Sequence, residues 1–207
     1  TNTVVVSLIS TLIIVVIVVY FQFLKRILKN KTITFFNEVI SLTYALPGAV
    51  IGLSLILLFT SYPFESELLI GSLGILVYAY VIRYMAVGIS PLKSSFDKHP
   101  ISYDDTAFNL GMGPTKLFRS IHLPINKSAI AIAFLITFVD IIKELPITLI
   151  LRPFNFDTLA VQTYEYAIEE MIPKSSIYSL AIVMLGTILL IFLKKIVNKE
   201  IDVPKSK

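Results

Sequence analysis

Long apolar stretches, of which one is interrupted by charge and proline, constrain this sequence more than any other feature. Five of them approach or exceed the roughly 20 residues that a helix needs to cross a hydrocarbon core; they are 4–24, 40–61, 68–89, 128–151 and 177–193. Backbone amides in lipid must be paired within their own segment, so runs of this length form helices. At 56% hydrophobic and 15% charged residues, the chain departs from soluble domains in the membrane direction. The sequence therefore predicts a single all-α domain, a polytopic bundle of transmembrane helices surrounded by membrane lipid.

The basic residues indicate how the chain is oriented in the membrane. Fourteen of the 18 lysines and arginines follow the first, third or fifth predicted span, whereas the other two connections carry only Arg152 and Lys174 beside several acidic residues. Because basic loops stay on the cytoplasmic side, the start of the chain is predicted outside and its tail in the cytoplasm. The location is then the inner (cytoplasmic) membrane, with multiple passes. Topology explains the net charge of +4, and no nucleic-acid partner is predicted.

The longest predicted cytoplasmic connection, 90–127, is expected to contain a helix, a turn and a second helix. Acidic residues favour a helix start shortly before Ala107, because exposed amides and the helix dipole attract negative charge there. Gly111 permits a turn, and Pro114 suits the first turn of a following helix. By helical spacing, Ala107, Leu110 and Gly111 share a face that a partner can approach closely. The alternative is an ordinary connector between spans.

This pattern resembles the cytoplasmic coupling loop of binding-protein-dependent ABC permeases, written E-A-A-x3-G-x9-I-x-L-P. The residues in register with it are Asp105, Thr106, Ala107, Gly111, Ile121, Leu123 and Pro124. Two depart from it, since Asp105 replaces glutamate and Thr106 replaces alanine. The resemblance implies a type I importer permease whose loop docks on a separate ATPase subunit, which binds the ATP and magnesium. This chain itself would then be neither an enzyme nor the holder of a cofactor. Two further partners are implied, an extracytoplasmic substrate-binding protein and a second permease half or subunit.

Several stretches are similar to the ferric-iron subfamily of these permeases. They are 143–146, 151–160 and 164–167, while 44–52 looks like the opening of the second core helix in the wider family. The similarity is to the second of two units that the subfamily often fuses in one chain, so the resemblance implies a fragment of a longer permease. Ferric iron is the expected substrate. Thiamine, phosphonate and polyamine permeases share the architecture and are the alternatives.

Charged residues within the fourth predicted span are candidates for the translocation path. Charges inside a membrane are costly and usually face protein or a water-filled path, and helical spacing places Asp140 beside both Lys143 and Glu144. Lys143 can neutralise Asp140, which leaves Glu144 in need of another partner. Pro146 is expected to kink the helix near Ile142. The alternative is a buried ion network that holds helices together. No resident metal is predicted, because the adjacent lysine disfavours one.

Two other functional classes are compatible with a helical membrane protein. An ion-driven secondary transporter would favour interrupted helices in paired repeats, and the sequence suggests one interrupted span, 128–151, without a counterpart. A membrane enzyme would need a cluster of catalytic groups, and none stands out. The nucleotide-binding pattern G-x-x-x-x-G-K-[ST] does not occur. Energy for transport is therefore expected from a partner.

Overall fold

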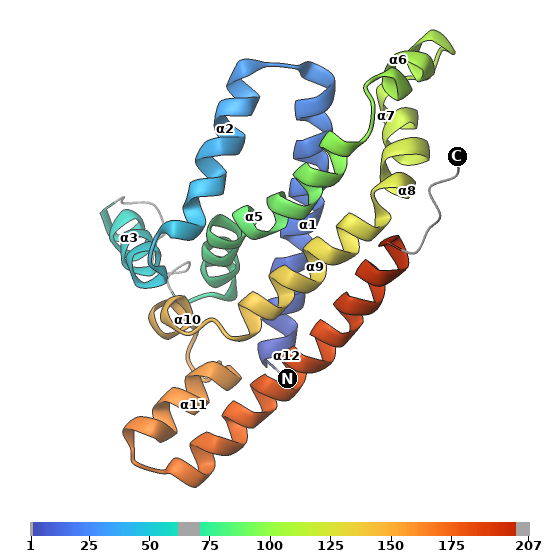
Figure 1. Ribbon diagram of the computed structural model, residues 1–207. Coiled ribbons are helices and arrows are strands. Elements are labelled where there is room, and N and C mark those ends of the chain that lie inside the picture. Colours follow the sequence, from blue (N-terminus) through green and yellow to red (C-terminus); the bar gives the residue numbers. More distant parts are fainter. Residues whose placement is uncertain (1, 62–70, 202–207) are drawn as a thin grey trace.

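Helices form all the regular structure in the computed structural model, which describes residues 2–61 and 71–201 (Figure 1). Three of them are long and apolar enough to cross a membrane: α1 (Asn2–Leu28), α5 (Leu73–Lys98) and α12 (Ile172–Ile201). The number of possible spans rises to five if each of two bent helix pairs crosses as one span. These pairs are Lys31–Ala45 with Gly48–Ser61, and Pro114–Ile125 with Lys127–Ile142. The predicted all-α membrane bundle is confirmed. The beginning of the third predicted span, 68–70, lies outside the described residues.

The second predicted span is bent. Helix α2 (Lys31–Leu42), continued by the 3-10 turn η1 (Thr43–Ala45), meets α3 (Gly48–Ser61) at an angle of 110°. The cause is local, because a residue that precedes proline is driven towards the extended conformation, and Leu46 has ψ 133°. The carbonyl of Pro47 then accepts the first helical hydrogen bonds of α3.

The fourth predicted span is divided into α9 (Lys127–Ile142) and α10 (Pro146–Leu151). Lys143 caps α9, and Pro146, which has no amide to donate to a preceding turn, starts α10. The expected kink is therefore a complete break. With the bend before α3 there are two interrupted spans, so the expectation of a single one without a counterpart is wrong. The bend before α3 could not be predicted from the sequence, because Pro47 is equally compatible with the first turn of a continuous span. The two shorter pieces, α3 and α10, pack against each other.

The connection from α5 to α9 is itself helical. It holds α6 (Ser102–Asn109), α7 (Pro114–Leu117), the π-helical turn η2 (Phe118–His122) and α8 (Leu123–Ile125). The last three form a nearly continuous helix, which meets α9 at 71°. In Figure 1, α6 projects from the end of the bundle where α1 finishes, while the start of α1 and α11 (Leu159–Ile168) lie towards the other end.

Helix α5 forms the centre of the packing. It lies along α1 and α9 and also contacts α2, α3 and α10. Gly88 allows α1 to come close, since a Cβ there would lie 3.3 Å from Ile14 Cγ2; small residues at helix contacts are typical of membrane bundles. Helix α12 packs on α9 and α11 and leaves apolar side chains outside, such as Ile177 at 67% exposed. Such outward apolar faces suit lipid.

Candidate transport cavity and the α6–α8 loop

The segment 102–125, here called the α6–α8 loop, turns at Gly111. This glycine has φ +79°, a left-handed conformation that other residues adopt only with strain. The amide of Met112 donates to the carbonyl of Ala107 at 3.0 Å, and the amide of Gly111 donates to the carbonyl of Phe108 at 2.9 Å. These two bonds are the Schellman motif, which satisfies the last carbonyls of a helix. The predicted helix, turn and second helix are therefore present.

The seven residues that match the family motif divide between the inside and the outside of the α6–α8 loop. Ala107 is 3% exposed and belongs to the hydrophobic core, and Ile121 and Leu123 pack against that core. The exposed motif residues are Asp105, Thr106, Gly111 and Pro124. The small side chain at position 107 thus serves packing within this chain.

Three large apolar side chains are exposed in α6 or directly after it, among polar neighbours such as Asp105 and Thr106. Tyr103 is 49% exposed, Phe108 is 40% exposed and Leu110 is 76% exposed. Ala107 and Leu110 were expected to share a face; they differ in exposure, since Ala107 is buried, whereas Leu110 is the C-cap that follows the last helical residue, Asn109. The projecting loop therefore exposes two aromatic side chains and one leucine together with polar side chains.

Asp140 lies near the end of α9, where two side chains reach its carboxylate. Lys143 Nζ is 2.8 Å from Asp140 Oδ1, and the Tyr44 hydroxyl donates to Oδ2 at 3.4 Å. The predicted pairing with Lys143 is confirmed. The side chain of Asp140 is 14% exposed, whereas that of Lys143 is 59% exposed. The lysine therefore neutralises Asp140 from the open side, and such an exposed partner holds it by only about 0–1 kcal/mol.

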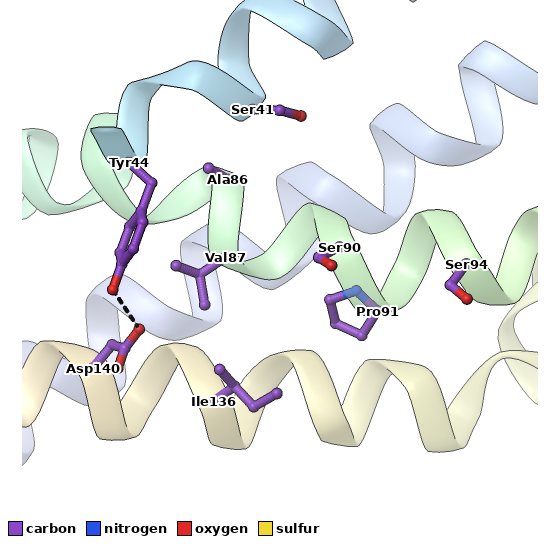
Figure 2. A pocket seen from close by; sticks show the side chains of 9 residues that line it. All are labelled: Ser41, Tyr44, Ala86, Val87, Ser90, Pro91, Ser94, Ile136 and Asp140. Atoms are coloured by element: carbon purple, nitrogen blue, oxygen red, sulfur yellow. Dashed lines mark hydrogen bonds between the residues drawn. The ribbon is translucent and has the colours of Figure 1, made fainter. Parts of the chain in front are cut away.

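A cavity of about 600 Å³ adjoins Asp140 (Figure 2). It lies between α2, η1, α5 and α9, and its lining residues are Ser41, Tyr44, Ala86, Val87, Ser90, Pro91, Ser94, Ile136 and Asp140. A second hollow of about 420 Å³ shares Ser41, Ala86, Ser90 and Ser94 and adds Lys93 and Asp97 towards the end of α5. Together the two hollows form a groove along α5, here called the α5 groove, which leads from Asp140 towards the α6–α8 loop.

The polar groups beside Asp140 in the larger cavity are hydroxyls, which were not among the residues predicted to line the path. Ser90 and Ser94 are four residues apart on α5, a spacing that could have indicated a polar face. Ser41 and Tyr44 come from α2 and η1, and their approach depends on the bend before α3. Among the residues that the structure describes, no three histidine, cysteine or acidic side chains are grouped to hold a metal ion.

Glu144 is buried in the break between α9 and α10, with 6% of its side chain exposed. The Tyr84 hydroxyl donates to its Oε2, and the amide of Ile147 donates to its Oε1 at 3.1 Å. Arg83 Nε lies 3.8 Å from Oε2, and Arg83 Nη1 donates to the carbonyl of Leu46 at 2.7 Å. Glu144 therefore finds the additional partner that the sequence required, and that partner is Arg83.

The Arg83–Glu144 pair joins the two helix breaks. Leu46 stands immediately before the bend into α3, and a Cβ on Gly48 would lie 2.8 Å from Glu144 Oε1 and 2.9 Å from Arg83 Nη1. Any larger residue at position 48 must displace them. Asp140 and Glu144 have different partners, contrary to the expectation that they share a helical face, because α9 ends before it reaches Glu144. Asp140 lines the cavity and Glu144 faces the interior.

Arg152 braces the connection from α10 to α11. Its guanidinium donates to the carboxylates of Asp157 and, at 2.5 Å, Glu165. Between these contacts Asn155 has φ +59°, and Phe154 is 99% exposed. The braced loop presents one aromatic ring to its surroundings.

Several apolar helices long enough to cross a membrane, with a polar groove and a projecting loop, define a multi-pass membrane protein. Residues 28–203 match the family described as binding-protein-dependent transport system inner membrane component. The chain therefore belongs to this family, the inner-membrane permeases of ABC importers. The match begins at the last residue of α1, so nearly all of that helix lies outside it. Membership also answers the alternative of an ion-driven transporter, which the two interrupted spans alone would have favoured.

Individual relatives differ in what they transport. The chain is 28% identical over 154 residues to the Fe(3+)-transport system permease protein FbpB 2 of Haemophilus influenzae. The aligned stretch covers 74% of this chain and 30% of the relative. The chain is 31% identical over 94 residues to the maltose/maltodextrin transport system permease protein MalG of Escherichia coli K12, covering 45% of this chain and 31% of the relative. The MalG of Photorhabdus laumondii matches to the same extent. The matched stretches thus make up less than a third of each relative.

Proposed function

We propose that this chain is the permease domain of an ATP-driven ferric-iron importer supplied by an extracytoplasmic binding protein. The choice of ferric iron as the substrate rests on the similarity to the Haemophilus influenzae Fe(3+) permease. That similarity extends over 74% of the chain, whereas the similarity to MalG extends over 45%. The α5 groove is consistent with a hard cation, because hydroxyls and carboxylates are oxygen ligands. A maltodextrin-type substrate is the second candidate, supported by MalG. Thiamine, phosphonate and polyamine are the remaining alternatives.

The α5 groove is the proposed translocation path, and Asp140 is the residue in it that contacts the cargo. A cation that enters the groove competes with Lys143 for the Asp140 carboxylate, and the exposed lysine can swing aside at little cost. Glu144 and Pro146 act behind the path: the first ties the helix breaks together, and the second starts α10. A second permease half would close the open side of the groove.

The α6–α8 loop is the proposed coupling element. Its exposed side chains, among them Phe108 and Leu110, would dock on a separate ATPase subunit, which binds ATP and magnesium, and the Gly111 turn would present them. Hydrolysis would then move the loop and switch the groove between two orientations as a rigid-body change. If the loop is cytoplasmic, α1 would begin on the outer side of the membrane, because its start lies away from α6 (Figure 1), and the tail of the chain would be cytoplasmic. The braced loop with Phe154 then faces the binding protein.

Uptake of radiolabelled ferric iron tests this proposal. Cells would express the full-length permease, its ATPase and its binding protein, with Gly111→Leu as the uncoupled control. Iron accumulation that disappears in the control is the expected result. If the complex assembles and hydrolyses ATP but accumulates no iron, the iron assignment fails, and labelled maltodextrin, thiamine, phosphonate and polyamine are tested in the same cells.

A further inference from the structure

Arg26, in the last turn of α1, is bonded both to the α6–α8 loop and to the end of α5. Its Nε lies 2.5 Å from Asp104 Oδ2. Its Nη1 and Nη2 donate to the carbonyls of Phe96, His99 and Pro100 at 2.5, 2.9 and 2.8 Å respectively. Carbonyls at the end of a helix lack helical partners, and the dipole there favours a positive charge. One guanidinium thus caps α5 and holds α6 at the same time.

Asp104 extends this contact to the second helix of the loop. Its Oδ1 lies 2.8 Å from His122 Nε2, and both residues are 4% exposed. The His122 ring stacks on Phe96 at 5.4 Å and meets Phe23 of α1 edge-on at 5.2 Å. Arg26, Asp104 and His122, here called the Arg26 cluster, therefore join α1, α5, α6 and η2 through buried contacts.

Helix α1 is also bonded at its other end. The Thr3 hydroxyl accepts a hydrogen bond from the amide of Leu159, the first residue of α11, at 2.8 Å. Between its two ends α1 packs along α5 and α9. Its 27 residues are unbroken, a length of about 40 Å at 1.5 Å per residue. The bent α2–α3 pair and the broken α9–α10 pair offer no comparable straight connection.

We propose that α1 is a rigid strut that moves together with the α6–α8 loop, and that Arg26 is the positioning residue that fastens it. The strut carries displacement of the loop to the outer end of the bundle, where α11 begins. The inference rests on the proposed coupling role of the loop. It goes beyond the family pattern, because Arg26 precedes the matched residues 28–203.

This chain contains no cysteine, so two introduced cysteines are the only labelling sites that it supplies, and any cysteine elsewhere in the full-length permease or in the ATPase would be replaced first. Suitable sites are Leu28→Cys on α1 and Ser120→Cys on the loop, both exposed. The distance between them would be measured in the full-length permease bound to its ATPase, with and without a non-hydrolysable ATP analogue. A rigid unit predicts one narrow distribution that shifts by no more than about 2 Å between states, the scale of movement within packed helices. A larger shift overturns the proposal, and this measurement needs no destabilising substitution.

Arg26→Met tests the fastening directly, with Lys25→Met as the matched control one residue away. The expected result is a broadened distribution and a fall of about fivefold or more in substrate transported per ATP hydrolysed, the usual scale of coupling between sites. Arg26→Lys should recover only part of this, because lysine keeps the charge but loses the fork of donors. A distribution as narrow in Arg26→Met as in Lys25→Met overturns the proposal. If instead Gly111→Leu leaves ATPase docking intact, the coupling role itself fails, whatever the label distances show.

Discussion

The substitution Glu144→Gln removes a buried negative charge while keeping the length of the side chain. The remaining carbonyl oxygen can still accept the Ile147 amide, but the Tyr84 hydroxyl loses a charged acceptor and Arg83 loses its carboxylate. The substitution Asp140→Asn removes a charge four residues earlier, where the partner is an exposed lysine. The two substitutions are therefore alike in chemistry and different in environment.

The contacts give the size of each effect. Loss of a hydrogen bond to a charged acceptor costs about 1.5–3 kcal/mol. Leaving a buried charge unpaired costs about 3–5 kcal/mol, but Arg83 is 17% exposed, lies 3.8 Å from the carboxylate and keeps the Leu46 carbonyl, so only part of that applies. We expect Glu144→Gln to cost about 2–4 kcal/mol in total. Asp140→Asn should cost less than about 1 kcal/mol.

Thermal unfolding of the purified permease and uptake at matched expression separate these effects. At about 2–4 °C per kcal/mol for a domain of this size, Glu144→Gln should lower Tm by about 4–16 °C and Asp140→Asn by less than about 4 °C. Asp140→Asn should nevertheless reduce uptake, since it alters the α5 groove. The reasoning is refuted if both variants melt alike, or if Asp140→Asn transports at the wild-type rate.

Three further substitutions test other parts of the molecule. Gly111→Leu must adopt a left-handed φ at a cost of about 1–2 kcal/mol and should abolish co-purification with the ATPase, whereas Gly113→Leu, at φ −73° with open space around it, should not. Gly48→Ala should force Arg83 and Glu144 apart and lower stability by about 1–3 kcal/mol in thermal unfolding; an unchanged Tm would contradict the packing. Burial lowers the pKa of His122 from its ordinary 6.5, against the opposing pull of Asp104. Stability from the neutral ring is therefore complete above pH 6.5 and is lost as pH falls towards the lower folded-state pKa, so wild-type Tm should drop more steeply below pH 6.5 than that of His122→Gln. Parallel curves would show that His122 does not titrate as inferred.

Features with a local cause could be predicted from the sequence. Apolar length alone gave the helical membrane bundle, because lipid leaves the backbone no other choice. Gly111 predicted the turn in the loop, and Pro146 predicted an interruption of the fourth span. The pairing of Asp140 with Lys143 followed from a three-residue spacing that still holds at the end of α9. Glu144 lies beyond that end, and for it the helical spacing misled.

Features that depend on distant residues had no such signal. The bend at Pro47 brings Tyr44 to Asp140 across 96 positions, and nothing near either residue announces the contact. The role of Arg26 was still harder to predict, because membrane topology already explained its charge: it is one of four basic residues after the first span. Its partner Asp104 lies 78 positions away and had its own sufficient explanation as an acidic residue at a helix start. Each charge satisfied a local rule, so their pairing became visible only when the fold brought α1 and α6 together. In a membrane protein the basic residues at span ends should therefore be examined for buried partners before they are assigned to topology alone.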